Sequence, residues 1–277
     1  MNKYILKIQT KDEKGLMHQI TKILYESNVN IEENNEYVDN DNKLFFMRTV
    51  FSSDKDDNIK NKIINALSSD SVITLNEVKK KNIIIMVTKE SHCMGDLLLR
   101  HFSDELNINI LSIISNYNNL SELASKFNIP YKYIAVDSLN REEHEILVTN
   151  ELNKFNNIDF IVLAKYMRVL TPNFVSNFEG KLINIHHSFL PAFIGANPYK
   201  RAHDRGVKII GATSHYVTSD LDEGPIITQE ILHVNHTYSA TDLKVAGRNV
   251  EKIALSKALD LAIEEKIFIF NNKTIIL

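Results

Sequence analysis

The sequence predicts an α/β protein with two domains, a small antiparallel sandwich and a larger, mostly parallel sheet covered by helices. Three observations carry this prediction. The N-terminal region has strand and helix patterns in the order βαββαβ. Later, short apolar runs rich in β-branched residues alternate with helical patterns, as expected of buried parallel strands. A charged stretch at residues 79–82 separates the two regions, so we expect domains at residues 1–81 and 82–277.

The first domain has the element order of a ferredoxin-like sandwich. Its third element is the hardest to see, because residues 30–38 are mostly polar and only Ile31 and Tyr37 mark a strand. The predicted strands lie at residues 4–9, 30–38, 44–51 and 72–78, and the predicted helices at residues 15–27 and 58–67.

The turn between the first strand and the first helix contains Asp12, Gly15 and Leu16. With this turn, the domain resembles an ACT domain, a regulatory module that often binds amino acids. Gly15 would let a ligand carboxylate approach the backbone at a helix N-terminus. The resemblance therefore implies an amino-acid effector site at these three residues. In the alternative, Gly15 only makes the turn and the module only pairs subunits, since fold analogy alone locates no site.

The second domain has the pattern of a Rossmann-like sheet followed by a long helix and a closing hairpin. Its predicted strands lie at residues 82–88, 108–114, 158–164, 181–184 and 208–213, and its predicted helices at residues 97–102 and 240–265. Apolar residues of the long helix predict a core or oligomer face, namely Val245, Ile253, Leu255, Leu259 and Ile263. Asn271-Asn272 indicates the hairpin turn, and Asn197-Pro198 another turn.

Three polar residues of the second domain stand at predicted strand ends: Asn184, His186 and Asp222. Asn184 and His186 are two residues apart, so their side chains lie on the same side of the strand. Asp222 follows the next strand in a turn-rich loop. Because ligands of open α/β sheets bind beyond strand ends, we expect the three to converge there. Taken singly, each has an ordinary structural explanation, but together they suit the attack of water on a small carbonyl.

Each of these side chains has chemistry that such a reaction needs. The Asn184 amide can donate to a carbonyl oxygen as it becomes an oxyanion. His186 can add a second donor or move a proton. Asp222 can position and deprotonate a water, or hold His186 charged, if burial raises its pKa. Ser214 and His215 end the next strand and are predicted to support Asp222 or His186.

Other reactive side chains are expected to be structural. His187 should point away from His186 and pack or support it. His92 and Cys93 suggest a metal, but no close-spaced ligand set accompanies them, so no metal is predicted. Cys93 is the single cysteine, which excludes an intrachain disulfide and fits a reducing cytoplasm.

Composition limits the classes of partner. With 277 residues, 44% of them hydrophobic, the chain is long enough for two domains with their own cores. The formal net charge of −3 gives no argument for nucleic acid. No signal pattern or membrane-spanning apolar run is seen, so we expect a cytoplasmic protein without a membrane partner. A homo-oligomer is expected.

The chain closely resembles the folate-dependent formyltransferase family in the segments NIHHSFLPAF and LDEGPII. The resemblance runs nearly end to end and includes VTKESHCMGDLL, LAKYMRVLTP, GRNVEKIALSKAL and the terminal TIIL. It implies that Asn184, His186 and Asp222 are the catalytic residues and that 10-formyltetrahydrofolate is bound as substrate, with no separate cofactor. It also implies a pterin pocket walled by Met167, Arg168, Val169, Leu170, Thr218, Ser219, Asp220 and Leu221.

Within that family the chain is most similar to members that hydrolyse 10-formyltetrahydrofolate to formate and tetrahydrofolate. That activity would supply formate and balance the one-carbon folate pool. A formyltransferase acting on a phosphorylated amine would need a phosphate-binding turn near residue 91, and the bulky pair His92 and Cys93 suits phosphate poorly. Two alternatives remain: transfer of the formyl group to an amine acceptor, and a non-catalytic protein that binds amino acids.

Overall fold

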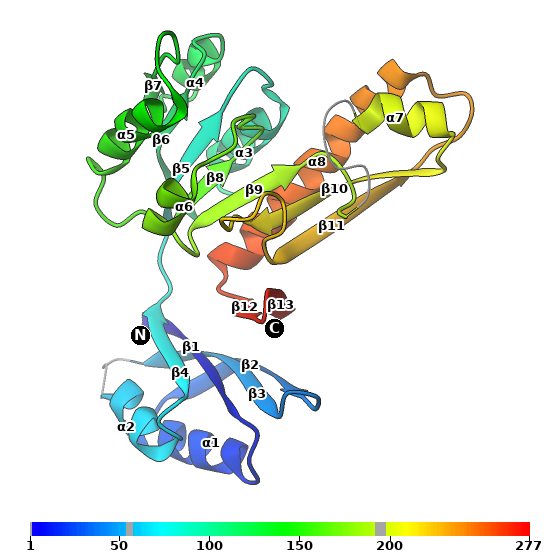
Figure 1. Cartoon of the computed structure of the whole chain (residues 1–277). Coiled ribbons are helices and arrows are strands. Elements are labelled where there is room, and N and C mark those ends of the chain that lie inside the picture. The colour runs from blue at the N-terminus through cyan, green and yellow to red at the C-terminus, as the bar shows by residue number, and fades with distance from the viewer. Residues whose placement is uncertain (1, 54–57, 192–197) are drawn as a thin grey trace. The chain divides into compact units, whose positions relative to one another are not determined.

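The computed structural model describes residues 2–53, 58–191 and 198–277, and Asn197 of one predicted turn lies outside these ranges. The chain forms two compact units (Figure 1). The first comprises Met1–Lys79, Glu265–Phe268 and Ile275–Leu277, and the second comprises Lys80–Glu264 and Ile269–Thr274. The two units share the C-terminal hairpin, so the division into domains at residue 81 stays a prediction.

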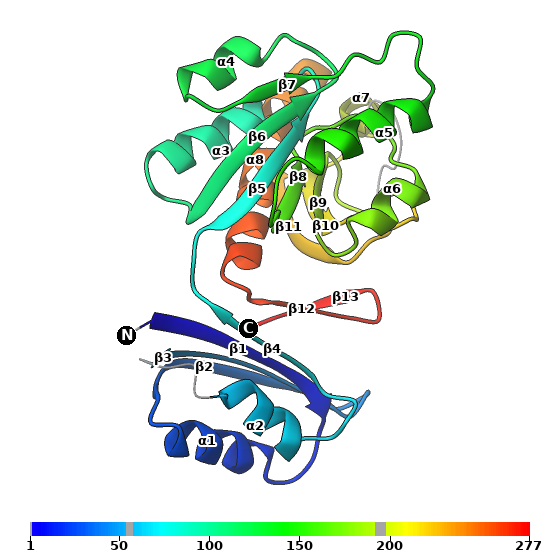
Figure 2. The same cartoon turned by 90° about the vertical axis from the view of Figure 1, so that its left-hand side faces the viewer.

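The first unit contains a four-stranded antiparallel sheet in the order β2-β3-β1-β4. Its elements are β1 (Asn2–Lys11), α1 (Leu16–Glu26), β2 (Asn30–Asp39), β3 (Leu44–Ser53), α2 (Ile59–Ala66) and β4 (Val72–Glu77). Both helices cover one face of the sheet (Figure 2). Leu6 and Ile8 alternate along β1 and pack with Ile20, Leu24 and Met47 in the core between sheet and helices. The predicted ferredoxin-like sandwich is confirmed, and the polar sequence of β2 suits its place as an edge strand.

The second unit contains a seven-stranded sheet in the order β11-β10-β9-β8-β5-β6-β7. Strands β7, β6, β5, β8 and β9 are parallel, whereas β10 and β11 are antiparallel to their neighbours. The strands are β5 (Lys81–Val87), β6 (Ile108–Ser115), β7 (Tyr131–Tyr133), β8 (Phe160–Leu163), β9 (Leu182–His186), β10 (Ile209–Tyr216) and β11 (Ile226–His233). The predicted mostly parallel α/β sheet is therefore confirmed.

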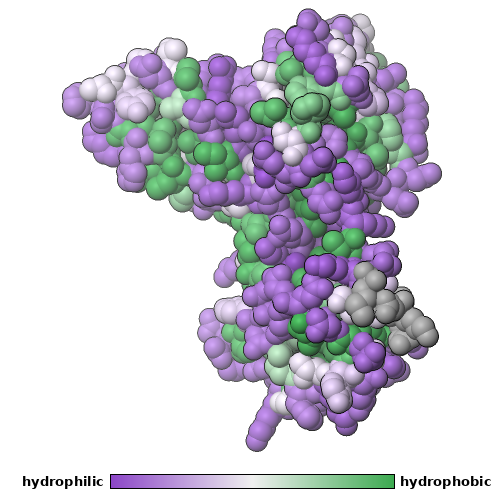
Figure 3. Space-filling view, turned by 180° about the vertical axis from the view of Figure 1, so that it is seen from behind, coloured by the Kyte–Doolittle hydropathy of each residue, from purple (hydrophilic) through white to green (hydrophobic). Residues whose placement is uncertain are grey.

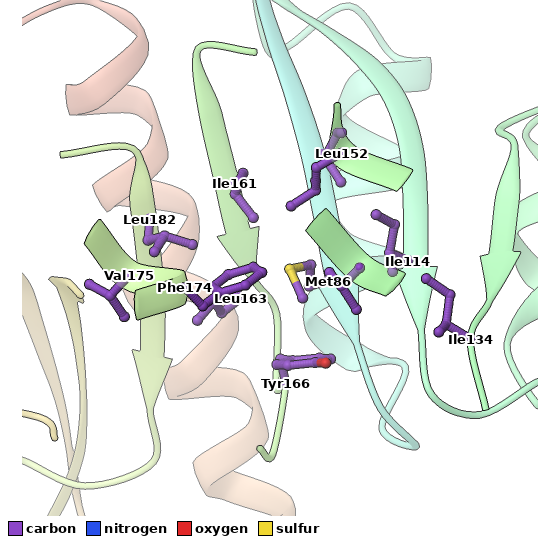
Figure 4. Packing of buried hydrophobic residues seen from close by; sticks show 12 residues of the cluster. Met86, Ile114, Ile134, Leu152, Ile161, Leu163, Tyr166, Phe174, Val175 and Leu182 are labelled. Atoms are coloured by element: carbon purple, nitrogen blue, oxygen red, sulfur yellow. The ribbon is translucent and has the colours of Figure 1, made fainter. Parts of the chain in front are cut away.

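Helices pack on this sheet, and the apolar side chains between helices and strands form hydrophobic cores. They are α3 (His92–Phe102), α4 (Ser121–Lys126), α5 (Arg141–Leu152), α6 (Pro172–Asn177), α7 (Pro198–Arg205) and α8 (Ala240–Ile263). Figure 4 shows Leu152 of α5 and Phe174 of α6 among Met86, Ile161 and Leu163 of the central strands. The α3 helix begins five residues before its predicted start, so it includes His92 and Cys93 in its first turn.

The long helix α8 lies against β9, β10 and β11 (Figure 1). Leu255, Leu259 and Ile263 are buried, as expected of a core face, whereas Val245 and Ile253 are about half exposed. Hydrophilic residues cover most of the face seen in Figure 3, with smaller hydrophobic patches between them. The hairpin after α8 consists of β12 (Ile267–Phe270) and β13 (Lys273–Ile276). Among the described residues, no helix combines the length and the apolar character that crossing a bilayer requires.

Candidate active site

Strand β9 and the loop after β10 bring the predicted trio together. Asn184 and His186 lie on β9, and Nδ1 of His186 is 3.2 Å from Oδ2 of Asp222. The Asn184 amide lies 3.2 Å from Nε2 of His215, whose Nε2 is also 3.7 Å from Oδ1 of Asp222. The amide, the two imidazoles and the carboxylate therefore form one cluster.

The strand before Asp222 runs in the direction opposite to the expected one. Because β10 is antiparallel to β9, the end of β10 lies beside the start of β9, with Tyr216 opposite Ile183. Asp222 reaches the site through its loop, not by ending a parallel strand. The loop explains the glycine of the Asp-x-Gly-Pro pattern. Asp222 has φ 58, a β-carbon on Gly224 would lie 1.8 Å from the carbonyl oxygen of Tyr216, and the carbonyl of Pro225 accepts the N–H of Tyr216.

Ser214 and His215 hold Asn184. His215 faces Asn184 directly across the β9–β10 ladder. Its Nδ1 donates to the carbonyl of Tyr216 at 2.9 Å, which leaves Nε2 to accept from the Asn184 amide when the ring is neutral. The hydroxyl of Ser214 donates to the carbonyl of Asn184 at 2.9 Å. His215 therefore contacts Asp222 as expected, but Ser214 fixes the backbone of Asn184.

Asp222 is held in its ionised form. Burial raises the pKa of Asp222, but the hydrogen bond from His186 and the neighbouring imidazole of His215 outweigh burial and hold that pKa well below its ordinary value of 3.8. The condition stated above, a pKa raised by burial, is therefore not met, because two imidazoles stabilise the carboxylate. Nε2 of His186 is buried and has no hydrogen-bond partner among the described residues, so it is available to a bound molecule.

All of the predicted pterin-pocket residues line one cavity of about 280 Å³ together with the trio. These lining residues are Met167, Arg168, Val169, Leu170, Thr218, Ser219, Asp220 and Leu221. Three apolar side chains among them are more exposed to solvent than core residues, at 61% for Met167, 42% for Val169 and 61% for Leu221. An apolar rim around a few convergent polar groups is typical of a small-molecule site.

His187 lies differently from its predicted position. Its ring stacks on that of His186, with centroids 4.9 Å apart, and it lines the same cavity. The chain leaves the strand at this point, so strict alternation no longer applies. Burial and the nearby charge of Lys165 lower the pKa of His187 to about 4, so its ring is neutral at neutral pH.

A second polar cluster, which the sequence did not reveal, surrounds the buried carboxylate of Glu251 on α8. Nε2 of His92 lies 2.7 Å from Oε2 and Nζ of Lys165 lies 3.3 Å from the same oxygen, while the hydroxyl of Tyr199 donates to Oε1 at 2.7 Å. Donor atoms of His92, Cys93 and Glu251 lie within 4.8 Å of one another, a grouping that could hold a metal. The ammonium of Lys165 already neutralises Glu251, and the absence of a metal stays a prediction.

The Glu251 cluster should make stability sensitive to acid. Burial raises the pKa of Glu251, but the hydrogen bond from His92, the charge of Lys165 and the hydrogen bond from Tyr199 outweigh it and lower the pKa from 4.5 to about 2. The contribution to folding is thus complete above the unfolded-state pKa and is lost as the pH falls toward the folded-state value. It is on the order of 3 kcal/mol.

The variant Glu251→Gln should lack this dependence on pH. We expect its deficit in free energy of unfolding, measured by urea titration, to be largest near neutral pH and to shrink at roughly pH 3. An equal deficit at both pH values would contradict the ionised state of Glu251.

The predicted effector residues occupy the turn before α1. Gly15 has φ 91, a conformation that favours glycine, and it is the residue that precedes the helix. Leu16 is buried and belongs to the core of the first unit, whereas Asp12 is exposed. The turn itself explains Gly15, and an effector at this position stays a prediction.

Comparison with known proteins gives a consistent picture. The sequence pattern of the formyl transferase family matches residues 81–259. A formyltetrahydrofolate deformylase from Haemophilus influenzae is 46% identical, with both chains covered over their full length. The crystal structure of a formyltetrahydrofolate deformylase from Pseudomonas syringae is 36% identical with a TM-score of 0.94, covering 100% of this chain and 94% of that one. A glycinamide ribonucleotide transformylase from Symbiobacterium toebii is 25% identical with a TM-score of 0.68, covering 72% of this chain and 94% of that one. The fold, the matched pattern and these relatives agree: the chain belongs to the formyl transferase family.

Proposed function

We propose that this chain is a hydrolase that converts 10-formyltetrahydrofolate to formate and tetrahydrofolate. The observation that carries the proposal is the convergence of Asn184, His186 and Asp222 on a cavity with an apolar rim. The relatives that match the chain over its full length are named for this deformylation. The reaction requires no separate cofactor, because the folate is itself the substrate.

The pterin ring binds between residues 167–170 and residues 218–222, and the formyl group faces Asn184 and His186. One N–H of the Asn184 amide is directed to His215, and the other donates to the formyl oxygen. Nδ1 of His186 donates to Asp222, so its Nε2 faces the substrate and donates to the same oxygen when the ring is charged. Both donors stabilise the oxyanion that forms when water adds to the carbonyl carbon.

Asp222 positions the attacking water. Its Oδ2 is paired with His186, whereas the longer 3.7 Å contact of Oδ1 with His215 leaves Oδ1 to accept from a water. As the bond from the water oxygen to the formyl carbon forms, the water becomes more acidic and Asp222 accepts its proton. The bond from carbon to the folate nitrogen then breaks, the nitrogen takes up a proton, and formate leaves.

Formyl transfer to an amine is the second candidate. It is favoured by a larger cavity of about 660 Å³ that adjoins the first and is lined by Lys89, Arg168, Lys200, Lys244 and Arg248 among others. Against it stands the first turn of α3, where the His92 side chain bonds Glu251 and Cys93 is buried. These two side chains make the turn a poor site for a phosphate.

Incubation with 10-formyltetrahydrofolate and no acceptor distinguishes the two functions. We expect formate and tetrahydrofolate to appear in equal amounts with continuous turnover, because water is the acceptor. Formate is measured with a coupled dehydrogenase assay, and tetrahydrofolate by chromatography. Substrate that is consumed only after an amine is added would instead establish the transferase.

Three further properties belong to the proposal. An amino acid binds at Asp12, Gly15 and Leu16 and changes the rate, the chain assembles with copies of itself, and it works in the cytoplasm, where its single buried Cys93 stays reduced. The same assay with each of the common amino acids tests the effector, and an unchanged rate throughout would exclude it. Light scattering tests the assembly, and the mass of a single chain would exclude it.

A further inference from the structure

Two adjoining cavities of the second unit share a wall. The smaller one, of about 280 Å³, contains Asn184, His186 and Asp222. The larger one, of about 660 Å³, contains Tyr199 and Glu251 among its lining residues. Four residues line both cavities, namely Lys165, Met167, Arg168 and His187. These four side chains therefore lie at the boundary between the larger cavity and a formyl group bound in the smaller one.

Lys165 and His187 are the fixed part of this wall. The side chain of Lys165 is only 7% exposed, and Nζ lies 3.3 Å from Glu251. Its backbone has φ 65, and its carbonyl accepts from the hydroxyl of Thr88 at 2.7 Å. The His187 ring is held by its stacking on His186. Met167, in contrast, is 61% exposed. We call Lys165 and His187 together the partition.

Residues behind the partition hold it in place. Glu251 is 1% exposed and binds Lys165 from one oxygen while Tyr199 binds the other. His92 completes the set at 2.7 Å. Gly247, one helical turn before Glu251, makes room for Tyr199, because a β-carbon there would lie 2.1 Å from the tyrosine hydroxyl oxygen. Removing Lys165 would leave a buried carboxylate without its cation, so the lysine is costly to displace.

We infer that the partition determines acceptor specificity: it keeps amines in the larger cavity away from the formyl carbon, so that water is the acceptor. The inference rests on the proposed hydrolysis. In hydrolysis the water oxygen bonds to the formyl carbon, the carbon–nitrogen bond of the folate breaks, the folate nitrogen gains a proton, and formic acid loses one. If a primary amine attacked instead, its nitrogen would form the new bond and lose one proton, and the folate nitrogen would gain one.

The test compares two acceptors in one reaction. The full chain is incubated with 10-formyltetrahydrofolate and glycinamide, a primary amine larger than water. Formate and N-formylglycinamide are then measured by mass spectrometry, after subtraction of the reaction without protein. Because both products come from the same bound substrate, their ratio is unaffected by a general loss of activity. The wild-type chain should release formate almost exclusively.

The matched variants are Lys165→Ala and Lys165→Met. Alanine opens the partition, so the ratio of N-formylglycinamide to formate should rise by about tenfold or more, the scale on which pocket contacts discriminate between substrates. Methionine keeps the length of the side chain without its charge and should keep the ratio near wild type. A second pair tests His187, the other residue of the partition: His187→Ala should raise the ratio and His187→Phe should keep it near wild type. Circular dichroism verifies that each variant is folded.

Three results would overturn the inference: an unchanged ratio in both alanine variants, an equal rise with methionine and alanine at position 165, or abundant N-formylglycinamide from the wild-type chain. None of these affects the proposed hydrolysis if the wild-type chain releases formate without amine. Failure to release formate in that control would instead refute the proposed function.

Discussion

The variant Asn184→Ala should release formate with a kcat about a hundred- to a thousandfold below that of the wild-type chain, the cost typical of losing one oxyanion donor. The side-chain amide of Asn184 lies 3.2 Å from Nε2 of His215, and the hydroxyl of Ser214 donates to the main-chain carbonyl of Asn184. The amide is thus oriented before substrate binds. Alanine removes the donor and leaves His186 alone to stabilise the oxyanion.

The loss should fall on kcat more than on KM. A hydrogen bond that strengthens as the carbonyl oxygen becomes an oxyanion stabilises the transition state more than the bound substrate. Steady-state rates of formate release over a range of 10-formyltetrahydrofolate concentrations separate the two constants.

Asn109→Ala is the matched control for this variant. Asn109 is exposed on β6 and donates to the side chain of Asn82, away from the catalytic cavity, so its kcat should equal that of the wild-type chain. An Asn184→Ala chain that is folded and keeps more than about a tenth of the wild-type kcat would refute an oxyanion role for Asn184.

Short-range patterns were sufficient to predict the first cluster. The Asn-x-His spacing on an apolar strand fixes the relative positions of Asn184 and His186, because side chains alternate along β9. Asp222 can be identified through its own loop motif, in which Gly224 is needed for the close approach of the loop to Tyr216. Such local constraints are visible in one sequence.

No short-range sequence pattern indicates the second cluster, which surrounds Glu251. Its members, Glu251, His92, Lys165 and Tyr199, come from four separate elements, and only the folded sheet brings them together. A glutamate in a helix such as α8 is expected in solvent, since charged residues are rarely buried without a partner. Sequence periodicity cannot show that partners arrive from α3, α7 and the loop after β8.

The pKa of Asp222 could not be predicted for the same reason. Burial alone raises a carboxyl pKa, and only the folded structure shows how closely His186 and His215 approach this carboxylate. Similarly, the antiparallel direction of β10 is hidden, because its apolar residues resemble those of a parallel strand. The pKa of Asp222 and the direction of β10 both depend on how segments that are distant in the sequence are arranged in the folded protein.

The variant Asp222→Asn should lower the rate of formate release by about a hundred- to ten-thousandfold, the range attributed to a positioned acid or base. Asparagine has nearly the same shape, but it cannot accept a proton from water, and it removes the negative charge beside Nδ1 of His186. The wild-type carboxylate is ionised throughout the neutral range, because its pKa lies well below 3.8. Its titration should therefore cause no loss of rate until the pH falls below that value.

Glu223→Gln is the matched control, since it removes one negative charge from the adjacent, exposed position of the same loop. We expect its rate to stay near that of the wild-type chain, because Glu223 does not line the catalytic cavity. Single-turnover measurements with enzyme in excess, at several pH values, separate the chemical step from product release. If Asp222→Asn and Glu223→Gln slow that step equally, the negative charge of the loop acts only through long-range electrostatics. Asp222 then does not position the water. A large loss confined to Asp222→Asn requires direct contact, because an exposed charge one residue away is screened by solvent more than a partly buried carboxylate bonded to His186.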